Sequence, residues 1–159
     1  MDSKWRNRLT RAMGQAELKV FAQPSRSQLD FLLAREAEQR KRRGFFGLPP
    51  DFAVAYVQAH DKPAQAFRLV WAQRQKETVA AMLFLLHGRV ATYHMGWSNE
   101  AGRDLNAHNA LLWRAMQELP QIGIDLLDMG GVNTEDLAGI SRFKLGAGGR
   151  VCTLPGTFF

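Results

Sequence analysis

The spacing of apolar residues changes from helical to strand-like and back along the chain. Apolar side chains three and four residues apart predict helices, and alternation predicts strands. The first third is therefore expected to hold a strand at residues 17–22 and helices at residues 5–14, 27–43 and 51–58. Residues 44–50 contain two glycines and two prolines, which predict a loop.

The middle of the chain predicts an antiparallel meander. Three strand-like runs occupy residues 67–72, 78–86 and 89–97, and their separators are short enough for hairpins. Residues 79–86 are apolar on both faces, which is typical of a strand covered by helices on each side. The second run is therefore expected at the centre of the sheet.

The last third completes one mixed sheet. Asn106 or Asn109 can cap a helix that ends before Pro120. A strand at residues 124–129, a helical turn at 137–144 and a strand at 151–154 are expected to follow. With 159 residues, 46% of them hydrophobic, the chain suits one core. We expect an α+β fold, a single domain over residues 1–159 with a mixed central sheet and helices on both faces.

Positive charge is concentrated at the front of the chain. The net charge is +6; residues 1–50 hold 11 basic and 5 acidic side chains, and the remainder holds 10 of each. The cluster Arg40, Lys41, Arg42 and Arg43 ends one predicted helix. It can attract nucleic acid, anionic lipid or a phosphate-bearing substrate. It can equally form a solvated helix face that offsets the partial negative charge at the helix end.

The sequence shows no metal site and no membrane span. Cys152 is the only cysteine, it has no partner suited to a nucleophilic triad, and it is expected to be buried. The four histidines lack ligand spacing, so no metal is expected. The longest apolar run, residues 79–86, is far shorter than the ~20 residues that cross a bilayer. Without a hydrophobic signal core, the chain is expected to be cytoplasmic.

Two strings near the carboxyl end resemble a known family. Residues 124–149 read IDLLDMGGVNTEDLAGISRFKLGAGG, and residues 107–116 read AHNALLWRAM. They are similar to the signature and the "LLW" helix of FemAB-like proteins, a branch of the acyl-CoA N-acyltransferase (GNAT) fold. That branch includes the bacterial aminoacyltransferases that build peptidoglycan cross-bridges, and its segment order matches the order predicted here.

The resemblance implies an N-acyltransferase that moves an acyl or aminoacyl group to an amine. The donor would be acetyl-CoA or another acyl-CoA, or alternatively an aminoacyl-tRNA that contacts the basic cluster. FemAB-like proteins generally pair two such domains, so a homodimer would rebuild the groove. CoA-dependent members use a glycine-rich turn for the pyrophosphate, whereas residues 99–108 (NEAGRDLNAH) lack its second glycine. The alternative is a non-catalytic binding or assembly module with the same fold.

Candidate site residues follow from the resemblance and from the predicted elements. The superfamily places the donor between two splayed parallel strands, here residues 89–97 and 124–129. The resemblance implies that Lys144 stabilises a leaving group or transition state, although it can also simply favour a helix end. Asp128 is a candidate general base or a loop acceptor. Arg142 can bind substrate phosphate or pair with a nearby carboxylate.

The remaining candidates concern donor or substrate binding. Gly130 and Gly131 allow close approach of a ligand, or form a plain turn. Tyr93 and His94 lie on opposite faces of one predicted strand, so at most one faces the cleft. Either can relay protons or be structural. His108, in the first turn of a helix, can meet a substrate anion or serve as a capping residue.

Overall fold

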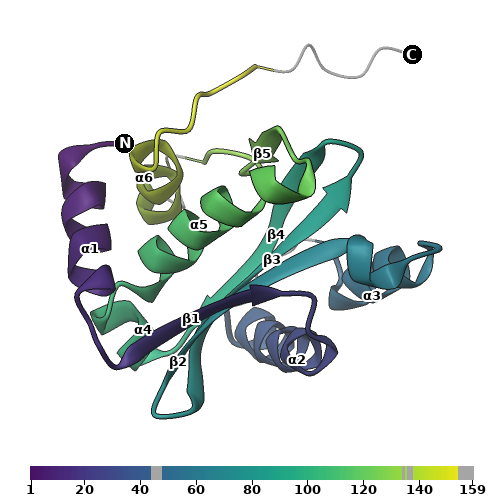
Figure 1. Cartoon of the computed structure of the whole chain (residues 1–159), viewed down its shortest axis with the longest axis horizontal. Coiled ribbons are helices and arrows are strands. Elements are labelled where there is room, and N and C mark those ends of the chain that lie inside the picture. The colour runs from purple at the N-terminus through teal and green to yellow at the C-terminus, as the bar shows by residue number, and fades with distance from the viewer. Residues whose placement is uncertain (44–47, 134, 136–137, 154–159) are drawn as a thin grey trace.

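The computed structural model describes residues 1–43, 48–133, 135 and 138–153 (Figure 1). Its α-helices are α1 (Ser3–Met13), α2 (Arg26–Arg43), α3 (Pro50–Gln58), α4 (Glu100–Asp104), α5 (Ala107–Glu118) and α6 (Ala138–Gly146). Its strands are β1 (Leu18–Gln23), β2 (Phe67–Arg74), β3 (Glu77–His87), β4 (Val90–Ser98) and β5 (Leu126–Asp128). Short 3-10 turns lie at Pro63–Gln65 and Pro120–Ile122.

The strands form one mixed sheet in the order β1-β2-β3-β4-β5. The first three pairings are antiparallel, and β4 pairs with β5 in parallel. The expected α+β fold, the meander and the central position of β3 are therefore confirmed. In β3, residues 79–86 are all buried, as their uninterrupted apolar character predicts.

Helices cover both faces of this sheet and create two apolar layers (Figure 1). One layer contains Trp5 of α1 and Leu111 of α5, and it packs against residues such as Met82 and Phe84. The other contains Leu29 and Leu32 of α2 and packs against the opposite face of the same strands. Because side chains alternate along a strand, β3 contributes to both layers.

A β-bulge changes the facing of side chains along β4. Leu83 pairs with Met95, but Phe84 pairs with Tyr93, which leaves His94 as an extra residue. Before the bulge, Tyr93 faces the layer beneath α5; after it, Met95 and neighbouring Trp97 face the layer of α2 and α3. Odd-numbered side chains of β4 therefore face one layer before the bulge and the other layer after it.

The first and last helices are joined at the backbone. The Asp2 amide donates to the carbonyl oxygen of Gly146, at 2.8 Å. The Asp2 carboxylate caps α1 by accepting from the Trp5 amide at 2.6 Å. A Cβ at Gly146 would lie 2.7 Å from an Asp2 carboxylate oxygen, so a larger residue there would displace the capping side chain. Trp5 also contacts the Phe143 ring of α6, with centroids 6.1 Å apart, and the half-buried Phe143 packs against the core.

Several local expectations were wrong. Residues 151–153 form no strand, and Leu154 lies outside the described residues. The expected burial of Cys152 is also wrong: it is exposed, because the chain leaves α6 and runs away from the body (Figure 1). Helix α4 was not expected; Asn99 caps it by accepting from the Gly102 amide at 2.9 Å. No helix in the described part of the chain is long and apolar enough to cross a membrane.

Candidate functional site

The central feature of the site is the point where β4 and β5 part. They pair only over Val90 with Leu126, Ala91 with Leu127, and Thr92 with Asp128. The strand expected at residues 124–129 is thus shorter in the structure, and beyond Thr92 β4 has no strand partner on this side within the described residues. Parallel pairing therefore ends at Thr92 and Asp128, where β5 also ends, and a donor site between these strands stays a prediction.

A glycine turn held by two charged side chains follows β5. The Asp128 carboxylate accepts from the Gly130 amide at 2.8 Å, and Gly130 has φ +71, which favours glycine. From α6, the Lys144 ammonium donates to the Gly131 carbonyl at 2.7 Å. Burial lowers the pKa of Lys144, and the charge of Asp128 opposes this effect. These four predicted residues therefore meet at the end of β5.

Tyr93 lies in β4 next to this turn, at the bulge. Its ring packs on Phe84, with centroids 5.8 Å apart, and its hydroxyl is 2.3 Å from where a Cβ of Gly96 would stand. Burial, together with the negative charge of Glu36, raises the pKa of Tyr93 to about 12. The phenol is therefore protonated at neutral pH and available as a donor.

The buried carboxylate of Glu36 was missed by the sequence analysis. It is 5% exposed and lies on α2, where Gln39 donates to it at 3.3 Å and Arg40 is 3.9 Å away. The signal was present, because Glu36 continues the helical spacing of Leu29 and Leu32 on the buried stripe. The next residue, Ala37, is exposed although it is apolar.

His94 faces the opposite side of the sheet from Tyr93. Its ring lies 5.6 Å from the Phe52 ring of α3, and its Nε2 is buried with no hydrogen-bond partner among the described residues. Burial lowers its pKa, and the charge of Arg40 lowers it further. His94 is therefore a neutral group beside Arg40, and it does not join the glycine turn that Lys144 contacts.

His108, in the first turn of α5, is tied to the far end of β4. Its Nε2 donates to the carbonyl oxygen of Trp97 at 3.1 Å, and its ring centroid is 6.3 Å from that of Phe143. Burial is the main cause that lowers the pKa of His108; the hydrogen bond to Trp97 opposes it, and the charge of Arg103 adds to it. A neutral imidazole attracts no anion, so this geometry favours a positioning role over anion binding.

Arg142 is not brought into the site. Its Nε donates to the Ala138 carbonyl of its own helix at 3.2 Å, and the side chain is exposed. No ion pair with Glu135 forms within the described residues, and Asp136 lies outside them. Its binding of substrate phosphate stays a prediction.

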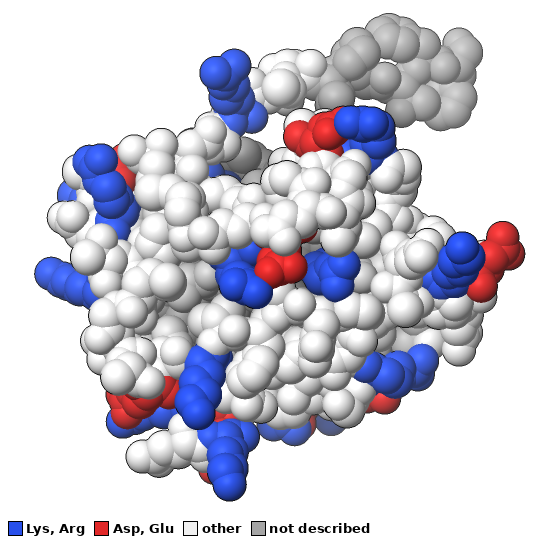
Figure 2. Space-filling model, viewed as in Figure 1, with Lys and Arg blue, Asp and Glu red and all other residues white. Residues whose placement is uncertain are grey.

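The basic residues that end α2 diverge around the helix. Arg40 is half-buried and donates to the Leu48 carbonyl at 2.6 Å, whereas Lys41 and Arg42 are exposed. The Arg43 side chain lies outside the described part. On the face shown in Figure 2, basic side chains stand in separate spots, some beside acidic ones. Contact of this cluster with tRNA stays a prediction.

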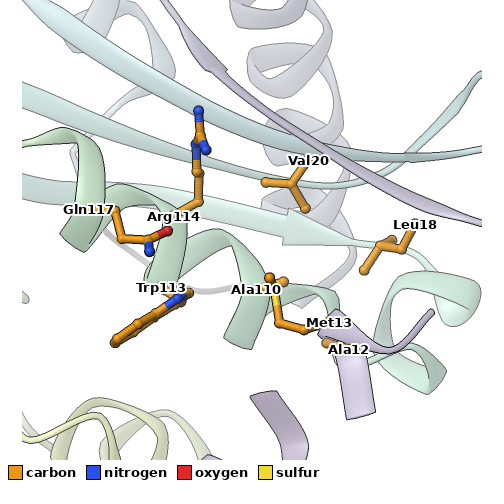
Figure 3. A pocket seen from close by; sticks show the side chains of 8 residues that line it. All are labelled: Ala12, Met13, Leu18, Val20, Ala110, Trp113, Arg114 and Gln117. Atoms are coloured by element: carbon orange, nitrogen blue, oxygen red, sulfur yellow. The ribbon is translucent and has the colours of Figure 1, made fainter. Parts of the chain in front are cut away.

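Away from the strand gap, a cavity of about 230 Å³ lies between α1, β1 and α5 (Figure 3). Ala12, Leu18, Val20 and Trp113 form its apolar wall. It contains none of the predicted site residues. Among the described residues, no group of three or more His, Cys, Asp or Glu is arranged to hold a metal ion.

Comparison with known families identifies this arrangement. The sequence model of the acetyltransferase (GNAT) domain matches residues 3–145. The chain belongs to the GNAT acetyltransferase family. This confirms the superfamily to which the carboxyl-terminal strings pointed. Comparison with curated proteins gave no match.

Solved structures of this GNAT fold are similar but distant in sequence. FemX superposes with a TM-score of 0.68 at 13% identity, covering 86% of this chain and 50% of FemX. A possible acetyltransferase from Clostridium difficile 630 gives 0.63 at 11%, covering 89% and 96%. The ribosomal-protein-S18-alanine N-acetyltransferase from Escherichia coli gives 0.56 at 15%, covering 80% and 75%. The chain thus spans about half the length of FemX.

GNAT acetyltransferases typically use acyl-CoA, but the turn after β4 does not fit a CoA diphosphate. The Gly102 amide is taken by the Asn99 side chain at 2.9 Å, and the Arg103 amide donates to the Asn99 carbonyl at 3.1 Å. A Cβ on Gly102 would lie 2.2 Å from the Val79 carbonyl oxygen. Gly102 is therefore needed for packing on β3, and its amide is not presented to a ligand.

We predict that Gly102→Ala destabilises this GNAT domain by about 1–3 kcal/mol, because the turn must shift away from β3. Gly139→Ala is the matched control, since a Cβ there meets no atom within 4 Å. Urea denaturation measures both. An equal effect of the two substitutions would show that the close contact with Val79 is not limiting.

The lowered pKa of His108 predicts acid sensitivity. In the unfolded chain the imidazole returns toward its ordinary value of 6.5, so below that pH the unfolded state binds more protons than the folded state. The free energy of unfolding should therefore fall as the pH drops through and below 6.5. His108→Gln, which keeps a donor for Trp97, should reduce that fall, with His94 supplying a remainder. Denaturation at about pH 7.5 and 5.5 tests this, with exposed His87→Gln as control. An equal change of the unfolding free energy with pH in the parent and in His108→Gln would contradict the prediction.

Proposed function

We propose that this chain is an N-acyltransferase in which an amine takes an acyl or aminoacyl group where β4 leaves β5. The observation that carries the proposal is the parting of the strands after Thr92 and Asp128, which leaves one side of β4 without a strand partner among the described residues. A strand edge without a neighbouring strand offers fixed N–H groups to a donor carbonyl, the kind of preorganised donor that contributes most to acyl transfer.

The proposed chemistry is direct transfer without a covalent enzyme intermediate. The amine nitrogen attacks the donor carbonyl carbon, a C–N bond forms, and the bond to the leaving sulfur or oxygen breaks. The attacking nitrogen loses a proton to a carboxylate, for which Asp128 beside the turn and Glu36 beyond the bulge are the candidates. Tyr93, whose pKa is about 12, returns a proton to the leaving group.

Lys144 supports this step in two ways. Its contact with the Gly131 carbonyl holds the glycine turn beside β4. Its remaining N–H donors can stabilise negative charge on the leaving group or transition state. Partial burial lowers the pKa of Lys144, and the charge of Asp128 opposes this effect by favouring the charged ammonium.

The finer family assignment is also a proposal. The FemX superposition and the FemAB-like strings support aminoacyl-tRNA as an alternative donor and a role in bacterial peptidoglycan synthesis in the cytoplasm. Because the chain spans 50% of FemX, a second copy is the natural source of a second groove wall. Light scattering of the purified chain tests such a homodimer.

A transfer assay tests the function. The purified chain is expected to acylate at least one amine in a panel of amino acids, peptides and amino sugars, using either acetyl-CoA or a charged tRNA. Mass spectrometry of the acceptor measures the product and separates the two donor classes. Absence of transfer from both donors would support the non-catalytic binding module instead.

The two tyrosines of the chain provide a matched pair for the mechanism. Tyr93→Phe should lower kcat by about 10²–10⁴, the range for loss of a general acid. Tyr56→Phe, whose hydroxyl donates to the Leu86 carbonyl at 2.6 Å, should cost about 1 kcal/mol of stability and leave kcat unchanged. Steady-state kinetics with thermal unfolding distinguish these outcomes. Equal kcat for Tyr93→Phe and the parent would remove Tyr93 from the mechanism.

A further inference from the structure

The bulge in β4 brings a glycine onto the same face of the strand as Tyr93. In a regular strand side chains alternate, so residues 93 and 96 would face opposite layers. His94 is an extra residue in the pairing with β3, and Gly96 therefore lies opposite Met82. The side chains of Met82 and Tyr93 belong to the same layer of the core. Tyr93 and Gly96 are thus successive positions on one face of β4.

The Tyr93 side chain extends along the strand until its hydroxyl lies over Gly96. Two residues of a strand span about 6.6 Å, and a tyrosine that leans along its strand covers this distance. A Cβ built on Gly96 would clash with the Tyr93 hydroxyl oxygen, whereas the ring atoms Cζ and Cε2 would be 3.2 and 3.4 Å away. The hydroxyl, more than the ring, therefore occupies the space that a side chain at position 96 would need.

Packing, rather than hydrogen bonding, holds the hydroxyl in this place. The Tyr93 ring packs against the layer beneath α5, with its centroid 5.8 Å from that of the fully buried Phe84. Within the described residues no hydrogen bond forms to the Tyr93 hydroxyl, whereas the Tyr56 hydroxyl donates to the Leu86 carbonyl. Because the ring is held, the hydroxyl can stay over β4 only while residue 96 has no side chain.

This hydroxyl lies over the part of β4 that has lost its second neighbour. Parallel pairing with β5 ends at Thr92, so Gly96 has no strand partner on that side among the described residues. A donor carbonyl that meets the N–H groups of this stretch would lie alongside the phenol. A group that gives a proton to a leaving atom must be within hydrogen-bond reach of it, so the position of the hydroxyl matters as much as its acidity.

Resting on the transferase function proposed above, we propose that Gly96 is a positioning residue that holds the Tyr93 hydroxyl over the unpaired part of β4. The bulge turns residue 96 toward Tyr93, and the missing side chain leaves room for the phenol oxygen. In the transfer step the phenol O–H bond breaks, its proton passes to the leaving sulfur or oxygen, and water restores it. A side chain at position 96 would change this step by displacing the Tyr93 hydroxyl.

A double-mutant cycle on stability tests the contact without requiring activity. Gly96→Ala in the parent should lower the Tm by at least about 4 °C, because the new Cβ and the hydroxyl cannot both fit. In the Tyr93→Phe background the nearest ring atom is Cζ, at 3.2 Å, so the same substitution should lower the Tm by less than about half as much. Gly139→Ala, whose Cβ meets no atom within 4 Å, is the matched control and should act equally in both backgrounds. An equal loss from Gly96→Ala in both backgrounds would overturn the proposal.

Ultraviolet titration of the phenol measures whether the hydroxyl has moved. Tyr56→Phe leaves Tyr93 as the only tyrosine of the chain. Burial, together with the charge of Glu36, raises the pKa of Tyr93 to about 12, so little phenolate should form at about pH 10.5. Adding Gly96→Ala should bring the hydroxyl nearer to solvent, lower its pKa toward the ordinary 10.0 and increase the phenolate severalfold at that pH. A titration unchanged by Gly96→Ala would count against the positioning role.

Kinetics then connect the position of the hydroxyl to the reaction. Gly96→Ala should lower kcat at least about tenfold and change KM less than about twofold, since an interaction made in the transition state is lost. Tyr93→Phe should restore stability to Gly96→Ala but not kcat. A parent-like kcat for Gly96→Ala would reject the positioning role and leave the transferase intact. Absence of transfer by the parent would instead reject the transferase, while the cycle and the titration would still decide whether Gly96 positions Tyr93.

Discussion

The candidate site depends on β4 losing one of its two neighbours halfway along its length. Strand β4 pairs with β3 along one edge, but with β5 over only three residues along the other edge. The remaining peptide groups of that edge must form hydrogen bonds with other groups or with solvent. His108 meets one such need by donating to Trp97. The glycine turn after β5 bends away at the same point, so the polar groups gather where the ladder ends.

The bulge at His94 determines which side chains meet there. Without the extra residue, Tyr93 and Met95 would face the same side; with it, Tyr93 stands beneath α5 and Met95 packs toward α2. Glu36 reaches this region from the α2 face and still influences the pKa of Tyr93. The strand thus brings titratable groups from both helical layers to one place, where burial strengthens their electrostatic interactions.

Apolar spacing predicted the large elements well because a strand buried on both faces, such as β3, needs apolar side chains at nearly every position. It could not reveal the bulge, since His94 has no local signal that distinguishes it from a paired residue. It overestimated β5, because Asp125 and Leu126 already donate to Arg89 where pairing begins and Gly130 turns the chain away. Spacing along α2 did contain the position of Glu36, but charge was read as a sign of exposure. The meeting of Asp128 and Lys144 at one glycine turn depends on the tertiary fold alone.

The backbone hydrogen bond from the Asp2 amide to the Gly146 carbonyl joins two residues that are separated by most of the sequence. Gly146 lies two residues after Lys144. The hydrogen bond therefore holds α6, which contains Lys144, against the start of α1. Closing so long a loop carries an entropic cost, which packing between α1 and α6 must offset. The amino-terminal segment is therefore mechanically coupled to the site. A bulky group fused directly before Asp2 would therefore change the position of Lys144, although the two residues are far apart in sequence.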